Sequence, residues 1–156
     1  ALNKPKVFFT ILDRVQDPGN VGTIIRTMDA AGGDGVVLLK GSADPYNPKV
    51  LRSTMGSIFR VPVFEVSDSK AFFESIIQKG IYILVSHLEG DSLFEWQGGM
   101  QRIALVIGNE SQGVADSISQ YASGMIKIPI MGAAESLNAS VAAGILIYYI
   151  LQKWVS

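Results

Sequence analysis

The sequence predicts an α/β fold with a mainly parallel sheet flanked by helices. Short apolar, β-prone runs alternate with segments of helical spacing along all 156 residues. The apolar runs carry few polar residues, as in GVVLLK (35–40), which is typical of parallel strands that are covered on both faces. No break in composition divides the chain, so we expect one domain over residues 1–156.

Six apolar runs are predicted to be strands because turn or cap residues bound each of them. They are 6–12, 35–40, 61–66, 81–86, 103–108 and 124–130. The connecting segments 13–20, 41–48, 87–102 and 131–138 are predicted loops.

Five segments between these strands are predicted to be helices, namely 21–33, 49–56, 67–80, 111–123 and about 137–153. In the first of them, apolar residues recur at helical spacing, and Gly32 and Gly33 end it. Ser67 or Ser69 is expected to cap the third, which Gly80 ends. The last helix is apolar on more than one face, so we expect it to be buried on several sides. Part of it, with residues of the segment 17–27, is expected to form a symmetric dimer interface.

Composition excludes several classes of site. Hydrophobic residues make up 48% of the chain and charged residues 17%, as in compact globular proteins. There is no cysteine and one histidine, His87, so neither a disulfide nor a thiolate or histidine metal site is expected. The longest apolar stretch, 141–151, is shorter than the roughly 18 residues of a membrane span, and no signal peptide is visible; the expected location is the cytoplasm.

Ligands of open α/β sheets bind at the carboxyl ends of the strands, and three loops there carry polar residues beyond the needs of a turn. In the first, Asn20 either caps a helix or serves the site. Arg26 stands among apolar residues, and an arginine near a core face needs a phosphate or carboxylate partner. In the second, IGNESQGV, Gly108 and Asn109 can stop the strand, whereas Glu110 is not needed for that purpose. No Gly-Lys-Ser/Thr follows, so it is not a P-loop.

The third loop, IPIMGAAESLNAS, is rich in small residues that allow a ligand to approach the backbone. Ser136 or Asn138 can cap the last helix, and one of the two is enough.

Together the three loops resemble the motifs of the SpoU/TrmH family of SPOUT RNA methyltransferases. The matching segments are DPGNVGTIIRT (17–27), ALVIGNESQGV (104–114) and IKIPIMGAAESLNASVAAGILIY (126–148). One such motif is a weak signal, but three in the correct order over almost the whole chain are specific.

The resemblance implies a catalytic domain in which S-adenosylmethionine donates a methyl group to a ribose 2′-hydroxyl of tRNA or rRNA, without a metal. It implies a deep trefoil knot near the C-terminus, a homodimer, and an active site near the subunit interface. Many members carry an N-terminal RNA-binding domain, which we expect to be missing from this chain or absent from the protein.

The resemblance also implies residue roles. The catalytic set is Arg26, Asn20, Glu110, Ser136 and Asn138, and the donor-binding set is Gly108, Asn109, Gly113, Ile128, Met131 and Leu137. The family proposal makes Arg26 the base, but a guanidinium is effectively always protonated, so we assign it to positioning the nucleotide and stabilising developing negative charge. Glu110 is expected to orient Arg26 or a neighbouring polar group.

Two alternatives remain open at this point: a SPOUT enzyme that methylates a base, and a non-catalytic RNA-binding or dimerisation module. The Asn-x-Gly-x-x-x-Arg spacing at 20–26 favours ribose, and the intact set of motif residues argues against a retired site. Lys49, Arg52 and Arg60 either contact RNA phosphates or form a solvated face.

Overall fold

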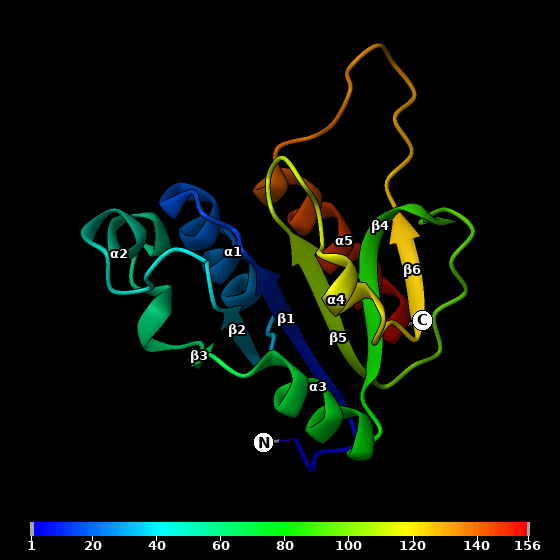
Figure 1. The fold of residues 1–156 in the computed structure, drawn as a ribbon, viewed down its shortest axis with the longest axis horizontal. Helices are drawn as coiled ribbons and strands as arrows, with labels where there is room; N and C mark the ends of the chain where they lie inside the picture. The colour runs from blue at the N-terminus through cyan, green and yellow to red at the C-terminus, as the bar shows by residue number, and fades with distance from the viewer. Residues whose placement is uncertain (1, 156) are drawn as a thin grey trace.

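Six parallel strands form one sheet with the order β3-β2-β1-β5-β4-β6 (Figure 1). The computed structural model describes residues 2–155. The strands are β1 Val7–Asp13, β2 Gly35–Leu39, β3 Val63–Val66, β4 Tyr82–Ser92, β5 Arg102–Gly108 and β6 Gly124–Lys127. The predicted α/β class and mainly parallel sheet are confirmed. The C-terminal knot stays a prediction.

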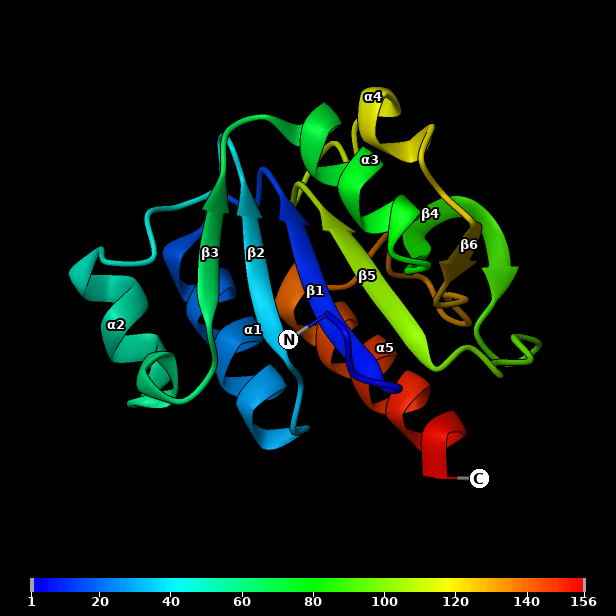
Figure 2. The same ribbon diagram turned by 90° about the horizontal axis from the view of Figure 1, so that it is seen from below.

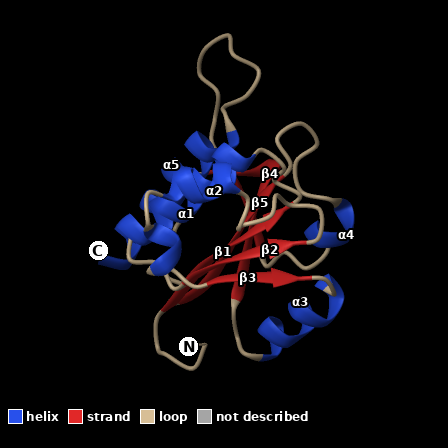
Figure 3. Ribbon diagram, turned by 90° about the vertical axis from the view of Figure 1, so that its left-hand side faces the viewer, coloured by secondary structure: helices blue, strands red, loops and turns tan. Residues whose placement is uncertain are grey.

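The helices lie in two layers, with α1, α2 and α5 on one face of the sheet and α3 and α4 on the other (Figures 2 and 3). Their bounds are α1 Pro18–Ala30, α2 Pro48–Thr54, α3 Ser69–Gln78, α4 Asp116–Ser119 and α5 Ala139–Val155, with a short 3₁₀ turn η1 at Ser57–Phe59. No helix among residues 2–155 combines the length and hydropathy needed to cross a membrane.

The central strand β1 is buried along its whole length because it contributes to both cores. Phe8 and Leu12 pack in the cluster that contains the apolar faces of α1 and α5, whereas Phe9 and Ile11 pack with α3. Successive side chains of a strand point to opposite faces, so a strand between two helical layers is mostly apolar on both faces; in β1 the buried polar residues are Thr10 and Asp13. This explains the continuous apolar runs in the sequence.

Several predicted elements have different extents in the structure, and two of them differ most. β4 continues to Ser92, beyond the predicted end at 86, because the register against β6 shifts between Ser86 and Asp91. Gly90 permits this, since a Cβ there would lie 2.8 Å from the backbone carbon of Ile126. The predicted helix 111–123 is reduced to α4, because residues 109–113 form a hydrogen-bonded turn instead.

The helix caps correct three of the predicted starts. Asp17 caps α1, its Oδ1 accepting from the Asn20 backbone N–H at 3.1 Å, so Asn20 lies inside the helix instead of capping it. Asp68 caps α3 in place of either serine that was predicted. Asn138 caps α5, as one of the two predicted alternatives, and the helix therefore begins at Ala139 instead of 137.

Candidate functional site

The carboxyl ends of β1 and β5 bring the first two predicted loops side by side, because Asp13 pairs with Gly108 in the sheet register. Glu110 then connects the loops. Its Oε2 accepts hydrogen bonds from the Asp17 N–H at 2.8 Å and from Asn20 Nδ2 at 3.3 Å, and its Oε1 accepts from the Gln16 N–H at 3.1 Å. The carboxylate thus holds the entrance of α1 against the loop after β5.

The pKa of Glu110 is lowered from its ordinary value by this arrangement. Partial desolvation raises it, but hydrogen bonds from the backbone of Asp17, Gln16 and Glu110 itself, together with the Asn20 side chain, outweigh that effect. Donors aimed at a carboxylate stabilise its charged form. Glu110 is therefore an ionised structural connector between the two loops.

The loop after β5 is a tight turn closed by its own backbone. Asn109 and Gly113 exchange two backbone hydrogen bonds of 3.0 and 2.9 Å, and Gly113 has a φ of +72°. The Asn109 Oδ1 also accepts from the backbone N–H groups of Ser111 and Gln112. A Cβ on Gly108 would lie 2.7 Å from the Gly113 carbonyl oxygen, so the turn folds back directly over Gly108.

Asp13 and Arg14 are functional candidates that the sequence reasoning missed. Arg14 has a φ of +59°, and its guanidinium donates to Gln112 Oε1 and to the Gly113 carbonyl oxygen, each at 3.0 Å. Its own carbonyl accepts from Asn109 Nδ2 at 2.8 Å. The buried Asp13 carboxylate accepts from Arg14 Nε at 3.2 Å and from the Ala115 N–H at 2.8 Å. The pair therefore fixes the turn from the β1 side.

Arg26 does not lie near the core, contrary to the prediction. Its side chain is exposed on α1, and within residues 2–155 it has no hydrogen-bond or ion-pair partner. Glu110 binds Asn20, the neighbouring polar group that was the predicted alternative to Arg26. Arg26 follows Gly22 by four residues and precedes Asp29 by three, so it lies on the helix face that contacts α2 and η1. Its guanidinium is thus available to a ligand.

The third predicted loop lies apart from the other two. Residues 128–138 project away from the body between β6 and α5 (Figure 1). Ile128 is half-buried, whereas Met131, Ser136, Leu137 and Asn138 are exposed. Among the described residues, the side chain of Asn138 bonds to Ser140 and Val141, within the start of α5. The structure therefore brings together Asn20, Gly108, Asn109, Glu110 and Gly113, but not the residues of the third loop.

The described residues contain no group of three or more histidine, aspartate and glutamate side chains placed to hold a metal. His87 is half-buried, and its Nδ1 accepts from the Glu89 N–H at 3.1 Å. What the assembled loops do offer is a tight turn that packs directly onto Gly108 and contains a second glycine, Gly113. Glycines without side chains allow a ligand to approach the backbone closely.

The family model described as the SpoU rRNA Methylase family matches residues 8–148. The chain belongs to this family. The match includes all three loops described above, and the expected family is confirmed.

One relative found by sequence and two solved structures are similar to the chain. The chain is 39% identical over 140 residues to the Bacillus subtilis 23S rRNA (guanosine(2553)-2′-O)-methyltransferase RlmP, covering 90% of this chain and 56% of that protein. It superimposes on the SpoU methyltransferase AviRb from Streptomyces viridochromogenes in complex with AdoMet, with a TM-score of 0.89, 31% identity, and coverage of 98% and 60%. An AdoMet-bound rRNA methyltransferase from Sinorhizobium meliloti gives a TM-score of 0.91 with 32% identity, covering 99% of this chain and 61% of that one. The chain therefore spans less than two thirds of these relatives.

Proposed function

We propose that this SpoU domain transfers the methyl group of S-adenosylmethionine to a ribose 2′-hydroxyl of tRNA or rRNA. The observation that carries this proposal is the bridge from Glu110 to Asn20 and the α1 entrance, on the same helix as an exposed Arg26 that has no hydrogen-bond or ion-pair partner among residues 2–155. The relatives support the chemistry: RlmP is named as a ribose methyltransferase, and two similar structures are described with AdoMet bound.

The donor would be held by Gly108, Asn109 and Gly113, with Ile128, Met131 and Leu137 contributed by the third loop. In the present arrangement the third loop stands away from the turn, so we infer that donor binding draws residues 128–138 toward Gly108. Ser136 and Asn138 would then approach Asn20 and fix the ribose by neutral hydrogen bonds.

The reaction forms one bond and breaks another. The ribose 2′-oxygen attacks the methyl carbon in line with the sulfur, the C–S bond breaks, and S-adenosylhomocysteine leaves. The hydroxyl proton passes to a phosphate of the RNA or to solvent, because the guanidinium of Arg26 cannot accept it. Arg26 positions the nucleotide and stabilises the negative charge that develops on the attacking oxygen.

The proposal extends to assembly and location. The last helix exposes Val141, Ile145 and Tyr148, which are spaced by four and three residues and so form one stripe. We infer that this stripe packs against a second copy of the chain, with the active sites near that interface, in the cytoplasm where RNA is modified.

A single-turnover assay tests the proposed function. The chain is incubated with radiolabelled S-adenosylmethionine and bulk bacterial tRNA or rRNA, and the RNA is digested to nucleosides. Label in 2′-O-methylated nucleosides supports the proposal, whereas label in a methylated base would assign the alternative chemistry. Calorimetry with S-adenosylhomocysteine, run in parallel, separates loss of donor binding from loss of RNA recognition.

A further inference from the structure

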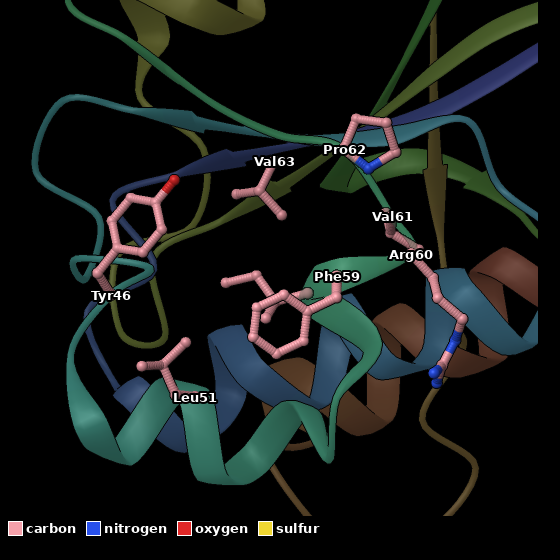
Figure 4. Close-up of a pocket in the computed structure, with 8 residues that line it drawn as sticks. Tyr46, Leu51, Phe59, Arg60, Val61, Pro62 and Val63 are labelled. Carbon is pink, nitrogen blue, oxygen red and sulfur yellow. The ribbon is translucent and has the colours of Figure 1, made fainter.

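A cleft of about 440 Å³ opens between α2, η1 and the edge strand β3, away from the Glu110 bridge (Figure 4). That size falls in the range of about 300–1,000 Å³ for small-molecule pockets. Its walls carry two aromatic rings, Tyr46 and Phe59, with Leu51 and Val63 between them. The rings are 67% and 88% exposed, respectively, so their faces are open to a ligand.

Charged side chains of both signs lie around this cleft, because the exposed Asp44 accepts a hydrogen bond from the Tyr46 N–H at 2.9 Å beside the cations. The exposed Lys49 and Arg52 lie on α2, and Arg60 is the one charged residue in the cleft lining. Arg60 points away from the hollow toward α1, where its Nη2 lies 2.8 Å from Asp29 Oδ2. Aromatic faces bordered by cations form a surface that suits an unstacked base and its phosphates.

One segment connects the cleft to α1, the helix that carries Arg26. A Cβ on Gly22 would lie 2.9 Å from the Val50 carbonyl oxygen, so the start of α1 packs directly on α2. Seven residues later on the same helix face, Asp29 Oδ2 accepts from Ser57 Oγ at 2.8 Å. Arg26 stands between these two contacts, and the segment 50–57 therefore separates Arg26 from the cleft.

We propose that the cleft of Tyr46 and Phe59 binds a nucleobase that flanks the methylated nucleotide, in an unpaired stretch of the RNA. This inference rests on the proposed function, because the RNA chain must continue from Arg26 over α2. A base paired in a duplex cannot present its face to these rings, so the cleft selects single-stranded or looped RNA. Lys49 and Arg52 contact the phosphates between the two nucleotides.

The test is binding of a fluorescein-labelled, non-self-complementary single-stranded RNA, followed by fluorescence anisotropy. Phe59→Ala and Tyr46→Ala should each weaken binding by about five- to a hundredfold, the usual loss for one stacked base, with unchanged melting temperatures because the rings are exposed. Phe59→Trp should retain affinity, and Phe59→Leu should not. Phe64→Ala is the matched control, since Phe64 is 55% exposed but lines a groove on the other side of β3.

The charge contribution is measured separately. Arg52→Ala should lower the slope of log affinity against log salt by about one, as expected for one lost phosphate contact. Lys70→Ala, an exposed cation on α3, should leave the slope unchanged. Annealing the oligonucleotide to its complement should weaken wild-type binding.

The outcomes separate the two proposals. If the wild-type chain binds no RNA, the proposed function itself fails. If it binds RNA and Phe59→Ala binds as well as Phe64→Ala, only the cleft assignment is overturned. The same conclusion follows if Phe59→Ala changes the sedimentation coefficient and not the RNA affinity, because the cleft would then belong to a protein interface.

Discussion

The side-chain amide of Asn20 donates to the carboxylate of Glu110 at 3.3 Å, across 90 residues of sequence. This bond, with those from the Gln16 and Asp17 N–H groups, makes the entrance of α1 and the turn after β5 one unit. Arg26 extends from the same helix with no partner among residues 2–155. The connector Glu110 and the proposed reacting group, Arg26, therefore have separate contacts, so substitutions can test them separately.

Arg26 is expected to act on the reaction and not on folding. Arg26→Lys keeps the charge but loses the planar fork, and Arg26→Ala loses both. Each should lower the single-turnover methyl-transfer rate by about 10²- to 10³-fold, the range for removing one group that stabilises developing charge. Melting temperature and donor affinity should stay near wild type, because the side chain is exposed and unpartnered. Normal transfer by Arg26→Ala would overturn the assignment.

Glu110 should give stability that depends on pH. Its pKa in the folded state is lowered, so its contribution is complete above the ordinary glutamate pKa and is lost as the pH falls through the folded-state value. Glu110→Gln should melt at a lower temperature than wild type at about pH 7, and the difference should shrink on acidification below about pH 4.3. Thermal melts over this range test it. A difference that stays constant at every pH would show that the charge is not the origin of the effect.

Gly108 should tolerate no side chain. Because a Cβ would meet the Gly113 and Val114 backbone, Gly108→Ala must displace the turn, at a cost of about 1–3 kcal/mol of stability. Donor affinity measured by calorimetry should fall with it. Gly144→Ala is the control, since a Cβ there would lie 4.0 Å from Thr27 Cγ2, an ordinary contact, outside the three loops. Unchanged donor binding by Gly108→Ala would place the donor elsewhere.

Arg14 has two roles that substitution can separate. Arg14→Gly and Arg14→Ala both remove the bonds to Gln112 and Gly113, so they should weaken donor affinity equally. Only alanine carries the steric penalty of the left-handed backbone, about 1–2 kcal/mol, so Arg14→Ala should melt at a lower temperature. Equal melting temperatures would mean that the backbone at this position relaxes without cost.

The α5 stripe should control the oligomeric state. Ile145→Asp places a charge in the centre of Val141, Ile145 and Tyr148, and burying it in an interface without a partner is unfavourable. Sedimentation velocity should show a dimer for wild type and a monomer for the variant. Ile77→Asp, at an exposed position of α3, should remain a dimer. A wild-type monomer at micromolar concentration would refute the proposed interface.

The fold class can be predicted from the sequence because strands that are buried on both faces appear there as short runs with few polar residues. The same reasoning identified Glu110 as a residue beyond the needs of a turn, and the structure supplies its partners. Helix starts were harder to predict, because Asp17 and Asn20 are equally suitable caps. Pro18, which favours the first helical position, was the signal that could have decided between them.

The surroundings of Arg26 and Arg14 depend on residues far away in the sequence, so local sequence patterns do not predict them. Arg26 was expected near a core because of its apolar neighbours, but its helix face meets α2, whose position depends on the tertiary fold. Arg14 adopts a backbone conformation that arginine seldom takes, and the contacts that hold it come from residues 109–113. Neither environment can be derived from short-range periodicity.

The pairing of β1 with β5 has a consequence for synthesis of the chain. Val7 lies opposite Arg102, and Asp13 opposite Gly108, so β1 must wait for a strand that is made much later. Until β5 leaves the ribosome, β1 is an open edge with apolar side chains on both surfaces, a state prone to association with other chains. Closing so long a loop also slows folding. Truncated chains that end before Arg102 are therefore expected to aggregate, and the nascent domain is a natural client for chaperones.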